Sequence, residues 1–188
     1  CILRGLDNSS KEDLVIVSDL DEIPNPKCIL DFSLSGKRFA AFKQMHFYYK
    51  FNLQSKKHPY WYGSRICKKK FLKSPQWLRE LKFKKRPFWR LDKLNLNNIL
   101  ENGGWHFCNL KTPNELLYKY KNLCETNDQY VFKESIDQKY LNVDSIKKKI
   151  ENGEDIIGRK DFFRKIEIDS SYPDFFKKNI QKYEEWIE

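Results

Sequence analysis

The sequence predicts an α/β protein with a mixed sheet, in which a strand-rich part is followed by a mainly helical part. Before residue 112, short apolar or alternating runs typical of strands recur between polar loops. After it come segments with helix start signals and apolar residues near helical spacing. The chain has 188 residues, 40% of them hydrophobic, which suffices for a buried core. We therefore expect one domain, strand-rich over 1–111 and mainly helical over 112–188.

The first predicted strand leads directly into acidic residues. "DLVIV", Asp13–Val17, is apolar and β-branched, which favours a buried strand that ends at Ser18. The prolines of the following "IPNP", Ile23–Pro26, lack the N–H groups that a strand ladder needs, so this segment is predicted to be a turn. A short helix or turn is expected over Cys28–Leu34.

The middle of the chain predicts further strands. Lys37–Leu53 is aromatic and partly alternating, which indicates one or two strands with a kink. Pro59–Leu72 is another strand candidate after a polar loop. Asn102–Gly104, "NGG", is a turn signal. Trp105–Leu110 is then expected to form a strand.

Three helices are predicted in the last part. Thr112 is a candidate N-cap, and Glu115 stands three residues later, as a capping box requires. The second helix is expected over Asn142–Gly153, with Gly153 closing it. The third is expected over Tyr172–Glu188, where apolar residues lie near helical spacing.

The acidic run after the first strand is the main candidate site. Asp19 and Asp21 stand two residues apart, so a tight turn can aim both carboxylates at one magnesium or manganese ion. A solvated acidic turn is the simpler interpretation. However, Glu22 adds a third carboxylate, and such crowding is unfavourable unless a cation or strong donors share the site. A divalent metal site at Asp19 and Asp21 is therefore predicted.

Two classes of enzyme place an Asp-x-Asp after an apolar strand. In phosphohydrolases of the haloacid-dehalogenase type the first Asp, here Asp19, is the nucleophile. That family usually has Thr or Val where Ile23 stands, and no downstream acidic pair after a second strand is evident. Metal-dependent nucleotide-sugar glycosyltransferases are the second class.

Several sequence blocks together favour the second class. The blocks are "DLVIVSDLDEIPNP" (13–26), "FYY" (47–49), "YWYGSR" (60–65), "GGWHF" (103–107) and "ENGEDIIGR" (151–159). In order and rough spacing they resemble glycosyltransferase family 17, which includes the enzyme that adds the bisecting N-acetylglucosamine to N-glycans. The most specific blocks are "SDLDEIP" and "GGWHF", and the resemblance extends from Cys1 to about Arg159.

The resemblance implies a GT-A-like fold, a nucleotide-sugar donor, most simply UDP-GlcNAc, and a divalent cation, Mn²⁺ or Mg²⁺. It places the cation and the donor diphosphate at Asp19 and Asp21. Only eighteen residues precede Asp19, fewer than the nucleotide-binding βαβ units of that fold occupy. The chain is therefore expected to be the C-terminal part of such an enzyme, truncated at the N-terminus.

The same resemblance suggests roles for further residues. Trp105 and His106 of "GGWHF" are expected to contact the donor, with core packing as the alternative for Trp105 and a structural hydrogen bond for His106. Glu22 and Glu125 are the candidates for the base that takes the proton from a glycan acceptor hydroxyl, with inversion at the sugar. Four aromatic residues, Tyr48, Tyr49, Trp61 and Tyr62, are expected mainly in the core, with an acceptor cleft as the alternative.

The basic charge of the chain is concentrated in one segment. The net charge is +10, and Arg65–Arg90 holds eleven basic residues with one acid, Glu80. A solvated surface is the simplest interpretation. Attraction of Lys68–Arg90 to an anionic membrane surface is the second, and binding of nucleic acid, with the interleaved aromatic residues stacking on bases, is the third.

Cysteines and hydropathy indicate the compartment. Five cysteines are scattered without a CxxC pair, which argues against a structural zinc site. Free thiols in a reducing compartment are expected, with one disulfide in a secretory setting as the alternative. No apolar stretch approaches the roughly 20 residues of a membrane span, and no signal peptide is evident. We expect a cytoplasmic or membrane-peripheral protein, or one of the Golgi lumen if the source is eukaryotic.

Overall fold

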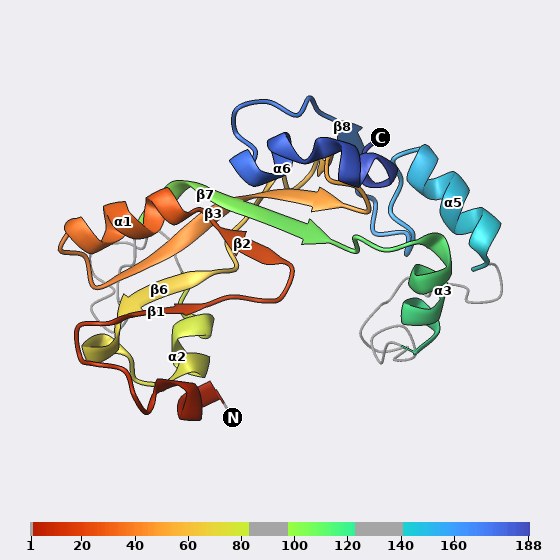
Figure 1. The fold of residues 1–188 in the computed structure, drawn as a ribbon. Coiled ribbons are helices and arrows are strands. Elements are labelled where there is room, and N and C mark those ends of the chain that lie inside the picture. The colour runs from red at the N-terminus through yellow and green to blue at the C-terminus, as the bar shows by residue number, and fades with distance from the viewer. Residues whose placement is uncertain (1, 83–97, 123–140) are drawn as a thin grey trace, which may run out of the picture. The chain divides into compact units, whose positions relative to one another are not determined.

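The computed structural model describes residues 2–82, 98–122 and 141–188. It divides the chain into two compact units (Figure 1). Unit 1 consists of Cys1–Met45 and Tyr60–His106, and unit 2 of His46–Pro59 and Phe107–Glu188. The hairpin after Met45 belongs to the same unit as the C-terminal half of the chain.

The described elements of unit 1 form one end of a β-sheet with two short α-helices. The strands are β1 (Leu14–Val17), β2 (Glu22–Pro24), β5 (Tyr60–Trp61), β6 (Arg65–Lys68) and the first parts of β3 (Phe39–Tyr48) and β7 (Ile99–Cys108). The helices are α1 (Pro26–Leu34), α2 (Pro75–Glu80) and the 3₁₀ turns η1 (Ile2–Leu6) and η2 (Lys69–Phe71). The predicted strand at Asp13–Val17 is confirmed as β1.

Strand pairing in unit 1 is mostly antiparallel. β6 lies between β1 and β3, with Ile66 opposite both Ile16 and Ala40. β2 pairs antiparallel with β7, and Glu22 stands opposite His106. β7 also pairs with β3.

The pair of long strands, β3 and β7, makes the sheet mixed. The N–H of Ala41 donates to Asn98 O over 3.0 Å, and further along both strands Tyr49 N–H donates to Cys108 O over 3.0 Å. The residue numbers rise together, so β3 and β7 are parallel. The expected mixed α/β architecture is thus confirmed.

Among its described residues, unit 1 has two apolar clusters. Residues from α1, β3, β6 and β7 make the first, which includes Phe32, Phe42 and Ile66. Residues from β1, β3, β6 and α2 make the second, which includes Phe39 and Leu78.

Unit 2 combines the ends of β3 and β7 with the C-terminal helices. Its further elements are β4 (Leu53–Ser55), α3 (Pro113–Asn122), α5 (Val143–Glu151), β8 (Phe163–Lys165), α6 (Asp174–Lys178) and the 3₁₀ helix η4 (Ile180–Trp186). β4 pairs antiparallel with β3 and with β8. One apolar cluster, including Tyr49, Leu116 and Ile146, draws its residues from β3, β4, α3, α5, β8 and the segments beside them.

The predicted helix caps of unit 2 are confirmed. Thr112 N–H donates to Glu115 Oε2 over 2.8 Å, and Glu115 N–H donates to Thr112 Oγ1 over 3.4 Å, which is the capping box of α3. The hydrogen bonds from Thr112 lower the pKa of the Glu115 carboxyl. Gly153 follows α5 with φ +65°, a left-handed conformation that ends the helix.

Three local predictions are wrong. Glu22–Pro24 forms β2 rather than part of a turn, because Pro24 ends the strand and Asn25 then caps α1 by accepting from Lys27 N–H. Asn102–Gly104 lies inside β7 rather than in a turn. The helix expected over Tyr172–Glu188 breaks at Asn179, between α6 and η4.

The glycines of β7 serve close strand approach. A Cβ on Gly103 would lie 2.5 Å from Lys43 N of β3, and one on Gly104 would lie 2.1 Å from Ile23 O of β2. Gly104 also has φ +125°, which few other residues adopt. The "GG" pair therefore lets β7 pair with strands on both of its sides.

The helix α2 was not predicted, although its signals are present. Ser74 accepts a hydrogen bond from Trp77 N–H over 3.0 Å, and Pro75 occupies the first turn.

In the described ranges, Cys28, Cys67 and Cys108 are free thiols, and burial raises the pKa of Cys67 to about 11. None of the helices among the described residues has the length and apolarity that crossing a membrane requires.

Candidate functional site

The acidic run forms the turn between β1 and β2. Glu22 N–H donates to Asp19 O over 3.1 Å, and Leu20 at the tip is fully exposed. β1 pairs antiparallel with β6. The turn is therefore not at the carboxyl end of a parallel sheet, where open α/β folds place ligands; it returns at once to β2.

Glu22 is the buried member of the three acids, with 6% of its surface exposed. Its Oε1 accepts from Trp61 Nε1 over 2.7 Å, and its Oε2 accepts from Ser64 Oγ over 2.8 Å and from Asp19 N–H over 3.1 Å. Buried charges need such partners, and hydrogen bonds to an ionised acceptor are the strong ones. The carboxylate therefore holds the turn against Trp61 of β5 and against Ser64, which follows this strand.

Gly63 makes room for this carboxylate. A Cβ on Gly63 would lie 1.5 Å from Glu22 Oε1 and 2.3 Å from Trp61 Nε1. Only a residue without a side chain allows the backbone after β5 to pass so close. "YWYGSR" and "SDLDEIP" are thus fitted to each other through a single carboxylate.

Asp21 lies against His106 of the "GGWHF" block. Nε2 of His106 is 3.3 Å from Asp21 Oδ2. The ring of His106 also lies 5.2 Å from that of Trp61, centroid to centroid. His106 is buried, whereas the side chain of Asp21 is 43% exposed. The half-exposed carboxylate is therefore oriented from within by a buried imidazole.

Asp19 has a cationic neighbour from α2. Arg79 NH2 donates to Asp19 Oδ2 over 2.8 Å, with the two side chains 55% and 43% exposed. An ion pair this exposed contributes little to stability. It does place a guanidinium, a good ligand for phosphate, beside the predicted metal ligand. Sequence reasoning missed Arg79; the Ser74-Pro75 cap was the signal that could have revealed its helix.

Trp105 and His106 do not share a face. Successive side chains of a strand point to opposite sides, and Trp105 pairs with Ile23 while His106 pairs with Glu22. Trp105 is 6% exposed, so the structure shows the core-packing alternative for it. Of the two, only His106 lies against the acidic turn.

The aromatic residues expected mainly in the core divide into two groups. Tyr48 and Tyr49 are buried. Trp61 and Tyr62 are 41% and 40% exposed, in that order. For these two the core expectation is therefore wrong. Trp61 lies in β5, whose side chains stay exposed although the strand pairs with β3, and Tyr62 follows β5 directly. Trp61 offers an exposed aromatic surface next to Asp21's partner His106.

The turn supplies some of the ligands that a hard cation needs. Asp19 and Asp21 supply two exposed carboxylates, the ligand type that Mg²⁺ and Mn²⁺ prefer. Within the described residues, no three His, Cys, Asp or Glu ligand atoms including either of them lie within 4.8 Å of one another. A cation here would complete its shell with water and substrate oxygens, as Mg²⁺ commonly does.

Two predicted features lie wholly or partly outside the described residues. Glu125 is one. The basic segment Lys68–Arg90 is described up to Lys82, and much of its charge there is engaged. Lys68 and Lys70 both pair with Glu12, over 3.0 and 2.7 Å. This part of the segment is therefore less cationic than its sequence indicates.

Comparison with known proteins gives no family assignment. No protein-family model, no curated protein and no solved structure matches the chain. What the chain does must therefore be argued from its motifs and from the geometry of the acidic turn.

Proposed function

We propose that the chain is the catalytic part of a metal-dependent glycosyltransferase with a GT-A-like fold. One observation supports this most. The two blocks with the most specific resemblance, "SDLDEIP" and "GGWHF", are 84 residues apart between Glu22 and His106, yet these residues are partners in neighbouring strands. Residues of both blocks thereby converge on the acidic turn.

The residues of the turn have distinct proposed roles. Asp19 and Asp21 would hold a Mn²⁺ or Mg²⁺ ion, which when bound neutralises the leaving diphosphate. Arg79 adds a guanidinium that can pair with a phosphate oxygen. His106 orients Asp21, and Glu22 fixes the turn by its hydrogen bonds to Trp61 and Ser64.

The substrates follow from the resemblance. UDP-GlcNAc is the proposed donor, and a glycan or glycoconjugate hydroxyl is the acceptor, with inversion at the transferred sugar. The exposed face of Trp61 suits a sugar ring, because aromatic side chains stack on apolar faces. Since Glu22 is occupied as an anchor, and Glu125 is not among the described residues, no base is assigned.

Calorimetry with UDP-GlcNAc, with and without Mn²⁺, tests the proposal. We expect binding that needs Mn²⁺ and is weakened about tenfold or more in Asp21→Asn, because a charged ligand oxygen is lost. Asp31→Asn, at an exposed position of α1, is the matched control and should bind as the unaltered chain does. Binding that is the same with and without Mn²⁺ and is unchanged in Asp21→Asn would contradict the proposal for this chain. The absence of any binding would contradict it as well.

A further inference from the structure

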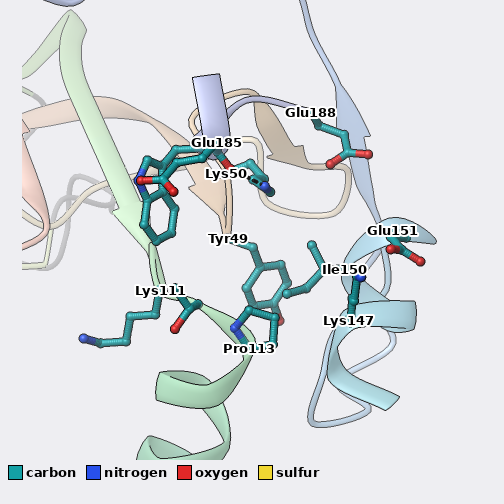
Figure 2. Close-up of a pocket in the computed structure, with 11 residues that line it drawn as sticks. Tyr49, Lys50, Lys111, Pro113, Lys147, Ile150, Glu151, Glu185 and Glu188 are labelled. Carbon is teal, nitrogen blue, oxygen red and sulfur yellow. Dashed lines mark hydrogen bonds between the residues drawn. The ribbon is translucent and has the colours of Figure 1, made fainter. Parts of the chain in front are cut away.

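Unit 2 contains a pocket of about 330 Å³ that none of the predicted metal, donor or base residues lines; of the aromatic residues considered for an acceptor cleft, Tyr49 lines it (Figure 2). Four segments contribute to it: the chain after β3, the start of α3, one side of α5 and the end of η4. The lining residues are Tyr49, Lys50, Lys111, Thr112, Pro113, Lys147, Ile150, Glu151, Glu185, Trp186 and Glu188. Its volume is at the small end of the range of about 300–1,000 Å³ found for small-molecule sites.

The centre of the pocket is apolar and firmly held. Figure 2 shows Tyr49, Pro113 and Ile150 together, with Lys111 on one side and Lys147 on the other. Tyr49 is 1% exposed, and its hydroxyl accepts from Ile156 N–H over 3.2 Å. The floor therefore exists before any ligand binds, as in most small-molecule sites.

The η4 wall is tied to the segment after β3. Phe51 N–H donates to Trp186 O over 2.8 Å, and Lys50 Nζ donates to Glu185 O over 2.6 Å. Both hydrogen bonds use backbone oxygens of η4. These bonds therefore occupy neither the indole of Trp186 nor the carboxylate of Glu185, two residues that line the pocket.

The charged groups of the lining balance. Three lysines stand against three glutamates, namely Lys50, Lys111 and Lys147 against Glu151, Glu185 and Glu188. A strongly anionic ligand would meet the carboxylates, and a cationic ligand would meet the ammonium groups. Donors and acceptors in equal supply instead suit an uncharged ligand with many hydroxyl groups, which both donate and accept.

Several of these charged groups are available to a ligand. Within the described ranges, the Lys147 ammonium and the Glu151 carboxylate, one turn apart on α5, form neither an ion pair nor a hydrogen bond with another residue. Both residues are exposed. A ligand can therefore bond to both groups without breaking a contact within the protein.

We infer that this pocket binds a sugar ring. A pyranose has an apolar C–H face and a rim of hydroxyl groups. The face would pack on Trp186 and Pro113 above the buried Tyr49, and the hydroxyls would bond to the Lys147 and Glu151 groups. This inference depends on unit 2 alone and is independent of the transferase proposal.

Saturation-transfer NMR on the whole chain tests this inference, with N-acetylglucosamine and methyl α-mannoside as probes. Glycine betaine and inorganic phosphate serve as zwitterionic and anionic comparisons. We expect transfer to at least one sugar and less to the two comparisons. Trp186→Ala should weaken sugar binding about tenfold, and Glu151→Gln should weaken it as well, since hydrogen bonds to charged groups are strong. Glu151 is exposed on α5, so this variant should fold even if Trp186→Ala does not.

Two matched variants locate the binding. Tyr118→Ala removes an aromatic side chain that is 73% exposed and not part of the pocket, and it should change nothing. Trp61→Ala and Asp21→Asn alter the acidic-turn site, so sugar binding that persists in both belongs to the pocket even if the transferase proposal fails. Sugar binding lost in Trp61→Ala but kept in Trp186→Ala, no binding of either sugar, or a preference for betaine or phosphate would overturn the inference.

Discussion

At the scale of single residues, the acidic turn satisfies its carboxylates one by one. Asp19 pairs with Arg79, Asp21 lies against His106, and Glu22 accepts from Trp61. Crowded acids need a cation or donors, and here each of the three acids has a protein partner. A metal at Asp19 and Asp21 is therefore compatible with the turn but is not needed to explain why the turn folds.

Gly63 gives the sharpest prediction at this scale. In Gly63→Ala the new Cβ, 1.5 Å from Glu22 Oε1, must displace the carboxylate or the chain. Losing a buried hydrogen bond to a charged group costs about 1.5–3 kcal/mol. We expect a loss of stability of at least this size, measured by urea unfolding, with a change in the fluorescence of Trp61.

The control is Gly5→Ala. Gly5 lies in η1, and a Cβ there would meet nothing within 4 Å. This variant should unfold within about 0.5 kcal/mol of the unaltered chain. Equal stability of the two variants would show that the backbone at Gly63 does not pass close to the Glu22 carboxylate.

At the scale of elements, the segment between α5 and β8 is organised by one buried acid. Asp155 Oδ1 accepts from the N–H groups of Ile157 and Arg159 over 3.0 and 3.1 Å. Its Oδ2 accepts from Arg159 Nε and NH2 over 3.2 and 3.0 Å. The resembling block "ENGEDIIGR" thus has a structural explanation: Asp155 shapes the loop that leads to β8.

We expect Asp155→Ala to lower the free energy of unfolding by about 3–5 kcal/mol, because it leaves a partly buried guanidinium and two N–H groups without their acceptor. Thermal unfolding followed by circular dichroism measures the loss. Glu154→Ala changes the neighbouring acid, whose carboxylate accepts a single long hydrogen bond among the described residues, from Asn152 Nδ2 over 3.5 Å. It should cost about 0.5 kcal/mol or less, and a similar cost for both variants would refute the role of Asp155.

The elements that sequence predicted well have local causes. β1 has a β-branched run, and α3 and α5 have cap residues within three positions of their starts. The elements that were predicted wrongly depend on contacts with segments far away in the sequence. "NGG" has the local signal of a turn, and Asn102 keeps a left-handed φ of +51°, but strands on both sides of β7 keep the segment inside the strand.

At the scale of the whole molecule, each apolar cluster belongs to one unit. Ile66 is part of a cluster of unit 1 and Ile146 of the cluster of unit 2, and both are fully buried. Since burial of apolar surface supplies most of the stability of a fold, the two units have separate sources of stability within the described residues.

A matched pair of substitutions tests this separation. Ile146→Ala and Ile66→Ala should each cost about 2–5 kcal/mol, because each leaves a cavity. In hydrogen exchange, we expect Ile146→Ala to accelerate exchange in α3 and α5 more than in β1 and β6, and Ile66→Ala to do the reverse. If both variants accelerate exchange equally throughout, the two units unfold as one.

The amino-acid pattern alone predicts the α/β class, the strand before the acids, the caps of α3 and α5, and the candidate carboxylates. These features are local: they depend on side-chain pattern and on hydrogen bonds between residues a few positions apart. The three-dimensional fold is needed to show that Glu22 is buried as an anchor, that Arg79 meets Asp19 and His106 meets Asp21, and that Trp61 is exposed while Trp105 is not. Strand partners and burial are set by contacts between distant segments, and no local signal specifies them.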